Sequence, residues 1–208
     1  MAFTVTAGTT IALEKLAPRF GMVDLPGGRK DHGRVVPLVG GVAIFIGLTV
    51  SLLGNAAISQ AIWLLATMAL MVGIGIVDDI HEIAARFKLA GQLAVATILV
   101  LTTGNTISSF GDLLGMGEVR TGVLGVPLTV FCVVGLMNAL NMIDGMDGLA
   151  GGLGLVSALA LALAADITGQ HHATIILTAF AASIAGFLVF NLRLPWQKMA
   201  RVFLGDAG

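Results

Sequence analysis

Charged side chains are scarce in this chain of 208 residues: 11% of the residues are Asp, Glu, Lys or Arg, and 57% are hydrophobic. Because soluble domains contain roughly 25% charged residues, this composition excludes an ordinary soluble protein and predicts an integral membrane protein. The formal net charge of −1 provides no overall positive field, which argues against a nucleic-acid partner.

Cysteine is almost absent as well. The single Cys132 lies within a long apolar run, which excludes a disulfide framework and a cysteine metal cluster and indicates a small packing residue. No basic segment precedes the first apolar stretch, so we expect no cleavable signal peptide. That stretch is too short to cross a bilayer, and we interpret it as the tail of a first helix.

Six apolar stretches approach the roughly 20 residues that a helix needs to cross a membrane. They are residues 37–53, 61–77, 89–103, 123–141, 149–165 and 173–192. Together with the partial first helix, they predict an all-α fold, a polytopic membrane helical bundle with about six full transmembrane helices.

The basic residues divide unevenly between the two sets of loops that alternating crossings would produce. Only Arg120 lies in the loops of one side, whereas all other Lys and Arg residues lie in the loops 14–36, 78–88, 142–148 and 193–208 or at their edges. By the positive-inside rule, the side with these four loops faces the cytoplasm.

Ionisable residues are missing from the middle of the membrane. None occurs within residues 38–77, 89–111 or 121–143. Proton and ion pathways usually keep such groups at mid-membrane depth, so a divalent-cation channel or transporter is only a remote alternative. The polar chemistry belongs instead to the cytoplasmic interface.

An acidic pair, Asp78 and Asp79, ends one of the apolar stretches. Neighbours on a helix point about 100° apart, and two carboxylates this close need a cation or a shared proton. The more ordinary interpretation is a helix end at the interface, in which Glu82 forms a helical ion pair with Arg86.

A second cluster consists of polar residues that recur every three positions: Asn138, Asn141, Asp144 and Asp147. A continuous helix would not place them on one face, so we expect the helix to end near Ile143 and a turn at Gly145 and Gly148 to bring them together. Their oxygens suit Mg²⁺. The alternative is a capped loop, in which Asp147 caps the next helix and Asp144 forms the turn.

Asp206, between two glycines, completes the acidic set. Five aspartates at one cytoplasmic cleft require cations, and we expect Mg²⁺ together with nearby basic residues to supply them. The candidates that would bind substrate phosphate are Lys30, His32, Arg34, Arg86 and Lys88. Ordinary positive-inside charges are the alternative for the first three.

Four stretches in a fixed order carry a family resemblance: DLPGGRKDHGRVVPLVGG, VDDIHEIAARFKLAGQ, NALNMIDGMDGLAGG and RVFLGDAG. The chain resembles the polyprenyl-phosphate N-acetylhexosamine-1-phosphate transferases, glycosyltransferase family 4, and is most similar to the undecaprenyl-phosphate N-acetylglucosamine branch. A transferase of the phospho-MurNAc-pentapeptide translocase type is the alternative. The resemblance implies transfer of a sugar 1-phosphate from a UDP-sugar to a polyprenyl phosphate, with Mg²⁺ or Mn²⁺ as cofactor and UMP as product, at the start of cell-surface polysaccharide synthesis.

The resemblance also implies roles for individual residues. Catalytic roles fall to Asp78, Asp79, Asp144 and Asp147, and metal binding falls to Asp206 and Asn141. Asn138 joins the five basic residues as a substrate-binding candidate.

The same resemblance implies a multi-pass protein of the bacterial inner (plasma) membrane whose active site faces the cytoplasm, and it leaves a homodimer open. We expect residues 1–208 to be one transferase domain truncated at both ends relative to the family. A non-catalytic fragment is therefore a further alternative.

Overall fold

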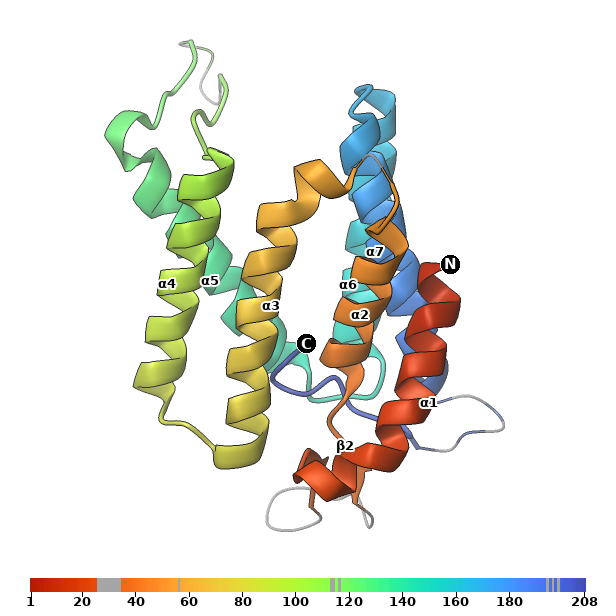
Figure 1. Ribbon diagram of the computed structural model, residues 1–208. Helices are drawn as coiled ribbons and strands as arrows, with labels where there is room; N and C mark the ends of the chain where they lie inside the picture. Colours follow the sequence, from red (N-terminus) through yellow and green to blue (C-terminus); the bar gives the residue numbers. More distant parts are fainter. Residues whose placement is uncertain are drawn as a thin grey trace.

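The computed structural model describes residues 1–25, 35–55, 57–112, 115, 117–193, 195, 197 and 199–208. Within this part the chain forms seven α-helices (Figure 1): α1 (Ala2–Phe20), α2 (Gly40–Leu52), α3 (Ile58–His81), α4 (Ala85–Thr103), α5 (Gly125–Ile143), α6 (Leu149–Ile167) and α7 (His171–Asn191). Two short strands, β1 (Val23–Asp24) and β2 (Val36–Pro37), pair antiparallel. A single 3₁₀ turn, η1 (Gly122–Leu124), precedes α5.

The predicted all-α membrane bundle is confirmed. The helices α3 to α7 are long and apolar enough to cross a membrane. The first two helices differ from the expected lengths. The helix α2 has 13 residues because Val36 and Pro37 before it are extended in a strand. The helix α1 has 19 residues and is longer than the short apolar helix tail that the sequence predicted, because it continues through the charged residues Glu14 and Lys15.

The polar ends of α3 and α4 extend beyond the apolar stretches. Asp78 and Asp79 lie in the last turn of α3, and the helix ends where Glu82 adopts a left-handed conformation with φ 47°. Because this residue breaks the helix, Glu82 and Arg86 do not share one helical face. Within the described residues no ion pair joins them, so the interpretation as a helical pair is wrong.

The helices pack in two groups. The first consists of α1, α2, α6 and α7, and the second of α3, α4 and α5. The loops after α3, α5 and α7 lie at one end of the bundle, and the loops after α2, α4 and α6 lie at the other (Figure 1). Loops that were expected to share one side of the membrane therefore share one end of the molecule.

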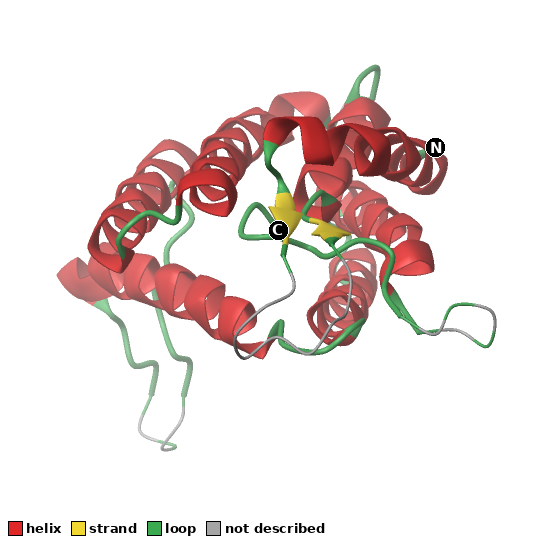
Figure 2. Cartoon of the chain, turned by 90° about the horizontal axis from the view of Figure 1, so that it is seen from below, coloured by secondary structure: helices red, strands yellow, loops and turns green. Residues whose placement is uncertain are grey.

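The last described residues, 199–208, form an extended segment that enters the bundle, and we call it the inserted segment. The N–H groups of Gly40 and Gly41, in the first turn of α2, donate to its carbonyls at 3.0 and 2.9 Å. The N–H of Phe203 donates to Pro37 O at 2.9 Å. The bonds from Gly40 and Gly41 satisfy helix-start N–H groups that otherwise lack partners. Viewed along the bundle, the helices surround the end of this segment (Figure 2).

The inserted segment also approaches α3 closely. A Cβ atom at Gly75 would overlap the backbone of Asp206 and Ala207. Glycine is therefore required at this point of α3, because any side chain would displace the inserted segment. The close approach sets the depth at which Asp206 enters the bundle.

Candidate active site

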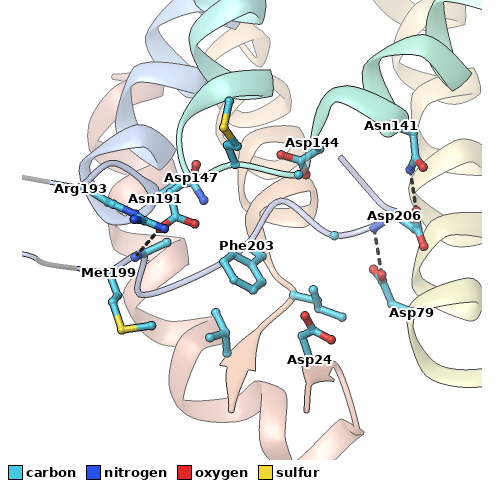
Figure 3. Close-up of a pocket in the computed structure, with 16 residues that line it drawn as sticks. Asp24, Asp79, Asn141, Asp144, Asp147, Asn191, Arg193, Met199, Phe203 and Asp206 are labelled. Atoms are coloured by element: carbon cyan, nitrogen blue, oxygen red, sulfur yellow. Dashed lines mark hydrogen bonds and ion pairs between the residues drawn. The ribbon is translucent and has the colours of Figure 1, made fainter. Parts of the chain in front are cut away.

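Asp206 lies where the inserted segment meets three helices. Its Oδ1 accepts two hydrogen bonds of 2.6 Å, from Lys88 Nζ on α4 and from Asn141 Nδ2 on α5. Its backbone N–H donates to Asp79 Oδ1 on α3 at 2.8 Å. Figure 3 shows Asp79 and Asn141 directed toward Asp206 from either side. Asp206 thus connects the three consecutive helices α3, α4 and α5, all of which are distant from it in the sequence.

Asp78 and Asp79 point apart, as expected for neighbours near a helix end. Asp78 is only 8% exposed. Its Oδ2 accepts an ion-pair contact from Lys88 Nζ at 2.8 Å, and its Oδ1 accepts the Ile83 N–H at 3.0 Å. Both oxygens of Asp78 are therefore engaged. Because the Lys88 ammonium contacts both Asp78 and Asp206, it reduces the repulsion between their charges.

Asp79 differs from its neighbour in having one oxygen without a partner. Its Oδ1 accepts the Asp206 N–H, whereas its Oδ2 is buried and has no hydrogen-bond partner among the described residues. The Oδ2 atom lies close to the Cα of Gly205, where an added Cβ would be 2.8 Å away. A buried acceptor without a partner is costly, so this oxygen is a natural contact for a proton or a cation.

The second polar cluster is divided by the end of α5, which falls at Ile143 as predicted. Asp144 follows as the C-cap, and the turn leads to Gly148, whose φ of 81° lies in the left-handed region. Asp147 does not cap α6, so that interpretation is wrong. Its Oδ2 instead accepts Arg193 Nε at 2.7 Å and the Ala200 N–H at 3.2 Å.

These groups surround a cavity of about 610 Å³ at the charged end of the bundle. Its polar lining includes Asp79, Asn141, Asp144, Asp147 and Asp206 (Figure 3). A smaller apolar cavity of about 180 Å³ adjoins it and is lined by residues of α2, α3, α5, α6, α7 and the inserted segment. The two cavities share Asn141, Asp144 and Gly205, so a polar and an apolar space meet at the acidic cluster.

The carboxylates of this cavity differ in their affinity for protons. Partial burial and the negative charges of Asp206 and Asp147 raise the pKa of Asp144 above its usual value. Burial acts on Asp206 in the same direction, but hydrogen bonds from Lys88 and Asn141 outweigh it and hold the pKa of Asp206 below its usual value. Asp206 therefore stays ionised and attracts cations, whereas Asp144 retains a proton more readily.

The remaining predicted site residues lie outside the cavity or outside the described residues. Asn138 donates to Gln92 Oε1 at 2.7 Å and to its own helix, one turn before Asn141. Arg86 is exposed and lies over the ring of Phe87, 5.0 Å from its centre. Their substrate-binding roles stay predictions. The stretch that contains Lys30, His32 and Arg34 falls outside the described residues.

Comparison with known proteins identifies the family. The sequence model of glycosyl transferase family 4 matches residues 61–208. The chain belongs to glycosyl transferase family 4. A similar protein is the undecaprenyl-phosphate alpha-N-acetylglucosaminyl 1-phosphate transferase of Escherichia coli O157:H7, with 35% identity over 195 residues, which cover 93% of this chain and 53% of the relative.

A second relative comes from Bacillus subtilis (strain 168), where the protein is named a probable undecaprenyl-phosphate N-acetylglucosaminyl 1-phosphate transferase. It is 32% identical over 214 residues, which cover 100% of this chain and 58% of the relative. The homologous protein of Yersinia pestis is 35% identical over 195 residues, which cover 93% of this chain and 53% of that protein. This family 4 chain thus spans little more than half the length of these relatives.

Polyprenyl-phosphate sugar-phosphate transferases of this family generally use divalent cations. The side chains around the cavity of this protein are of the types that bind such a cation. Among the described residues, no three His, Cys, Asp or Glu side chains converge as in an all-protein metal site. A hard cation such as Mg²⁺ does not need them, because it commonly binds one or two carboxylates and takes its other ligands from water and phosphate. Asp206, Asn141 and Asp79 supply oxygen atoms around one cavity.

The predicted site residues do not include three further polar residues that line the cavity, Asp24, Asn191 and Arg193. Asn191 is the last residue of α7 and is 4% exposed. Its sequence signal is a single amide that ends an apolar run just before a basic loop, much like Asn141 near the end of α5. Asp24 belongs to β1, and its proximity depends on the pairing of β1 with β2.

Proposed function

We propose that the protein transfers N-acetylglucosamine 1-phosphate from UDP-N-acetylglucosamine to undecaprenyl phosphate at the cytoplasmic face of the bacterial plasma membrane. The observation that carries the proposal is the contact of Asp206 with Asp79, Lys88 and Asn141 beside a cavity at the charged end of an apolar bundle. The names of the similar proteins supply the donor sugar and the lipid acceptor. The excess of basic residues at this end supports the cytoplasmic orientation.

The two adjoining cavities suit substrates of unlike polarity. A polyprenyl phosphate combines an apolar tail with an anionic head group at the membrane interface, and the apolar cavity of about 180 Å³ beside the polar one supports such an acceptor. The polar cavity of about 610 Å³ offers space for the phosphates of a nucleotide that arrives from water. Because both substrates and the lining are anionic, the reaction needs positive charge at their meeting point.

Two sources of positive charge are proposed. Lys88 places an ammonium group against Asp206 and Asp78. We further assign Asp206 and Asn141 as ligands of Mg²⁺, consistent with the low pKa of Asp206 and with the oxygen chemistry of both side chains. Bound there, Mg²⁺ would neutralise the diphosphate of the donor and stabilise the charge that develops on the departing UMP.

We assign different roles to the two residues of the acidic pair at the end of α3, Asp78 and Asp79. Both oxygens of Asp78 are occupied, so we assign it the role of holding Lys88. Asp79 has an oxygen without a described partner, and we assign it the role of orienting the acceptor phosphate and accepting its proton.

The turn after α5 would contact the donor. Asp144 lines both cavities, and we assign it a position beside the donor phosphates, where bound Mg²⁺ would offset its negative charge. Asp147, fixed by Arg193 and the Ala200 N–H, forms the adjoining wall, where we expect the nucleoside to bind.

The net reaction conserves atoms and charge. An oxygen of the lipid phosphate becomes bonded to the phosphorus that carries the sugar, and the bond from that phosphorus to the bridging oxygen breaks. The bridging oxygen leaves with its electron pair as part of UMP. The product is a lipid with a diphosphate link to N-acetylglucosamine.

The test measures UMP release by membranes that contain the protein, supplied with UDP-N-acetylglucosamine, undecaprenyl phosphate and MgCl₂. We expect Asp79→Asn and Asp206→Asn to lower the rate about 100-fold or more, as loss of a charge-stabilising group commonly does. Asp166→Asn, the same change at the opposite end of the bundle, serves as the matched control and should leave the rate unchanged.

Two results would contradict the proposal. The first is the absence of UMP from a folded, membrane-inserted protein. The second is a rate that neither EDTA nor Asp206→Asn affects. Release of UMP only with UDP-MurNAc-pentapeptide would identify the other donor and overturn the assignment of N-acetylglucosamine.

A further inference from the structure

We propose that Asn191 is a positioning residue that fixes the distance between the two acidic parts of the cavity. One part is the turn after α5, with Asp144 and Asp147, and the other is the inserted segment, with Asp206. The inference rests on the proposed function in treating these carboxylates as the reacting site. It assigns a role to an amide that neither the sequence motifs nor the proposed chemistry uses.

The assignment rests on two hydrogen bonds that one buried side chain makes to two different segments. Asn191 Oδ1 accepts the N–H of Gly148 at 2.8 Å, directly after Asp147. Asn191 Nδ2 donates to the carbonyl of Val202 at 2.9 Å, in the inserted segment. Because the side chain is only 4% exposed, water competes little for either bond. We call this arrangement the amide bridge.

The chemistry of the amide bridge requires asparagine. A hydroxyl donates and accepts at one atom, whereas an amide carries its donor and its acceptor on two separate atoms, so that one short side chain can bond two segments at once. An aspartate of the same shape accepts the Gly148 N–H but, when ionised, donates nothing to Val202 O. Leucine fills a similar volume and provides neither bond, so both backbone groups lose their partners in a buried setting.

The amide bridge also replaces a missing helix cap. Gly148 is the N-cap of α6, and no side chain caps that helix from within its own turn. The Gly148 N–H therefore depends on Asn191, at the end of a neighbouring helix. As a result, the position of the turn that carries Asp144 and Asp147 is tied to α7 rather than to α6 alone.

A second link between the same segments is a single bond, in which the Ala200 N–H of the inserted segment donates to Asp147 Oδ2 at 3.2 Å. The same oxygen accepts Arg193 Nε at 2.7 Å, but the Arg193 side chain is 67% exposed, and water and salt screen exposed ion pairs. The two bonds of the amide bridge are shorter, at 2.8 and 2.9 Å, so the amide bridge is the stronger of the two links.

The experiment combines backbone hydrogen exchange with enzyme kinetics on the purified protein in detergent. Exchange is followed by mass spectrometry in peptides that cover residues 144–152 and 199–208. In Asn191→Leu we expect exchange to rise about tenfold in both peptides. The Gly148 N–H loses its acceptor, and the inserted segment opens more often once Val202 O has lost its buried donor. We expect kcat for UMP release to fall at least about tenfold while KM for UDP-N-acetylglucosamine changes less, because misplacement affects the reacting geometry more than binding.

Asn191→Asp separates the two bonds of the bridge. Its carboxylate still accepts the Gly148 N–H, so exchange should rise in 199–208 and stay near the parent value in 144–152. Ser183→Ala is the matched control, because Ser183 is a fully buried polar residue of the same helix that donates only to Ala179 O, at 3.0 Å. It should change neither peptide.

The outcomes distinguish the two proposals. Parent-like exchange in both peptides of a folded Asn191→Leu protein would overturn the amide bridge, as would equal effects of Asn191→Leu and Ser183→Ala. If Asn191→Leu does not fold, equal exchange of the two peptides in Asn191→Asp is the overturning result. If the parent releases no UMP, the proposed function fails, whereas the exchange data still decide the role of Asn191.

Discussion

Replacing Gly75 by alanine tests whether the close approach of α3 to the inserted segment positions Asp206. The added Cβ would overlap the backbone of Asp206 and Ala207, and backbone atoms cannot move aside as a flexible side chain does. To restore an ordinary carbon contact, the segment must shift by roughly 1 Å. A shift of that size breaks the 2.6 Å bonds from Lys88 and Asn141 to Asp206.

The expected magnitude follows from this overlap. Overpacking of a well-packed interior usually costs about 1–3 kcal/mol, so Gly75→Ala should lower the unfolding temperature in detergent. It should also reduce UMP release about 100-fold, because it displaces a proposed metal ligand. Gly73→Ala is the matched control on the same helix, since a Cβ at Gly73 meets no atom within 4 Å.

Thermal unfolding and UMP release are measured side by side for the parent and both variants. We expect Gly73→Ala to match or slightly exceed the parent in stability, because alanine favours a helix more than glycine by about 1 kcal/mol. If Gly75→Ala behaved like Gly73→Ala in both assays, the close approach would not position Asp206 and the reasoning would be refuted.

Three further predictions concern the charges of the cavity. Lys88→Met should lower UMP release about 100-fold, because Asp78 and Asp206 lose their shared cation. Arg120→Met is the control and should leave the rate unchanged, because the Arg120 side chain is 79% exposed and lies at the far end of the bundle. Equal rates in the two variants would count against the role of Lys88. Removing divalent cations with EDTA should abolish UMP release, and added Mg²⁺ should restore it; a rate that persists in EDTA would exclude the metal. Asp144→Asn should unfold at a higher temperature than the parent at pH 7 in EDTA, because a raised pKa means that ionising Asp144 costs stability. This difference should disappear as the pH falls to the ordinary pKa of 3.8, and a constant difference across that range would contradict the assigned cause.

The sequence predicted the helical bundle because long apolar runs have few other stable forms in a membrane. It also predicted the end of α5 at Ile143, where glycines follow polar residues. The C-terminal end of α3 and the start of α4 were less predictable. Asp78 and Asp79 belong to α3 and Lys88 belongs to α4, but charged residues interrupt the apolar pattern from which the helix ends were predicted. The length of α2 depended on the pairing of Val36 and Pro37 with β1, which no local pattern reveals.

The acidic residues of the cavity could be proposed from their shared side of the membrane, but their partners could not. The contact of Lys88 with Asp206 joins residues 118 positions apart, and hydropathy carries no information about such pairs. Asn191 was missed for a related reason. A single amide at the end of an apolar helix resembles an ordinary interface residue until its two backbone partners are seen.

The inserted segment has a consequence for the biogenesis of the protein. Asp206 follows Asp79 by 127 residues, so at about 5–20 residues per second the ribosome needs roughly 6–25 s to deliver it after the acidic pair. During this interval α3 to α7 enter the membrane without the segment that completes the cavity. Under the proposed function, the groups that hold phosphate and metal come together only after the helices have assembled, so the order of synthesis would keep a partly inserted protein from acting on substrates.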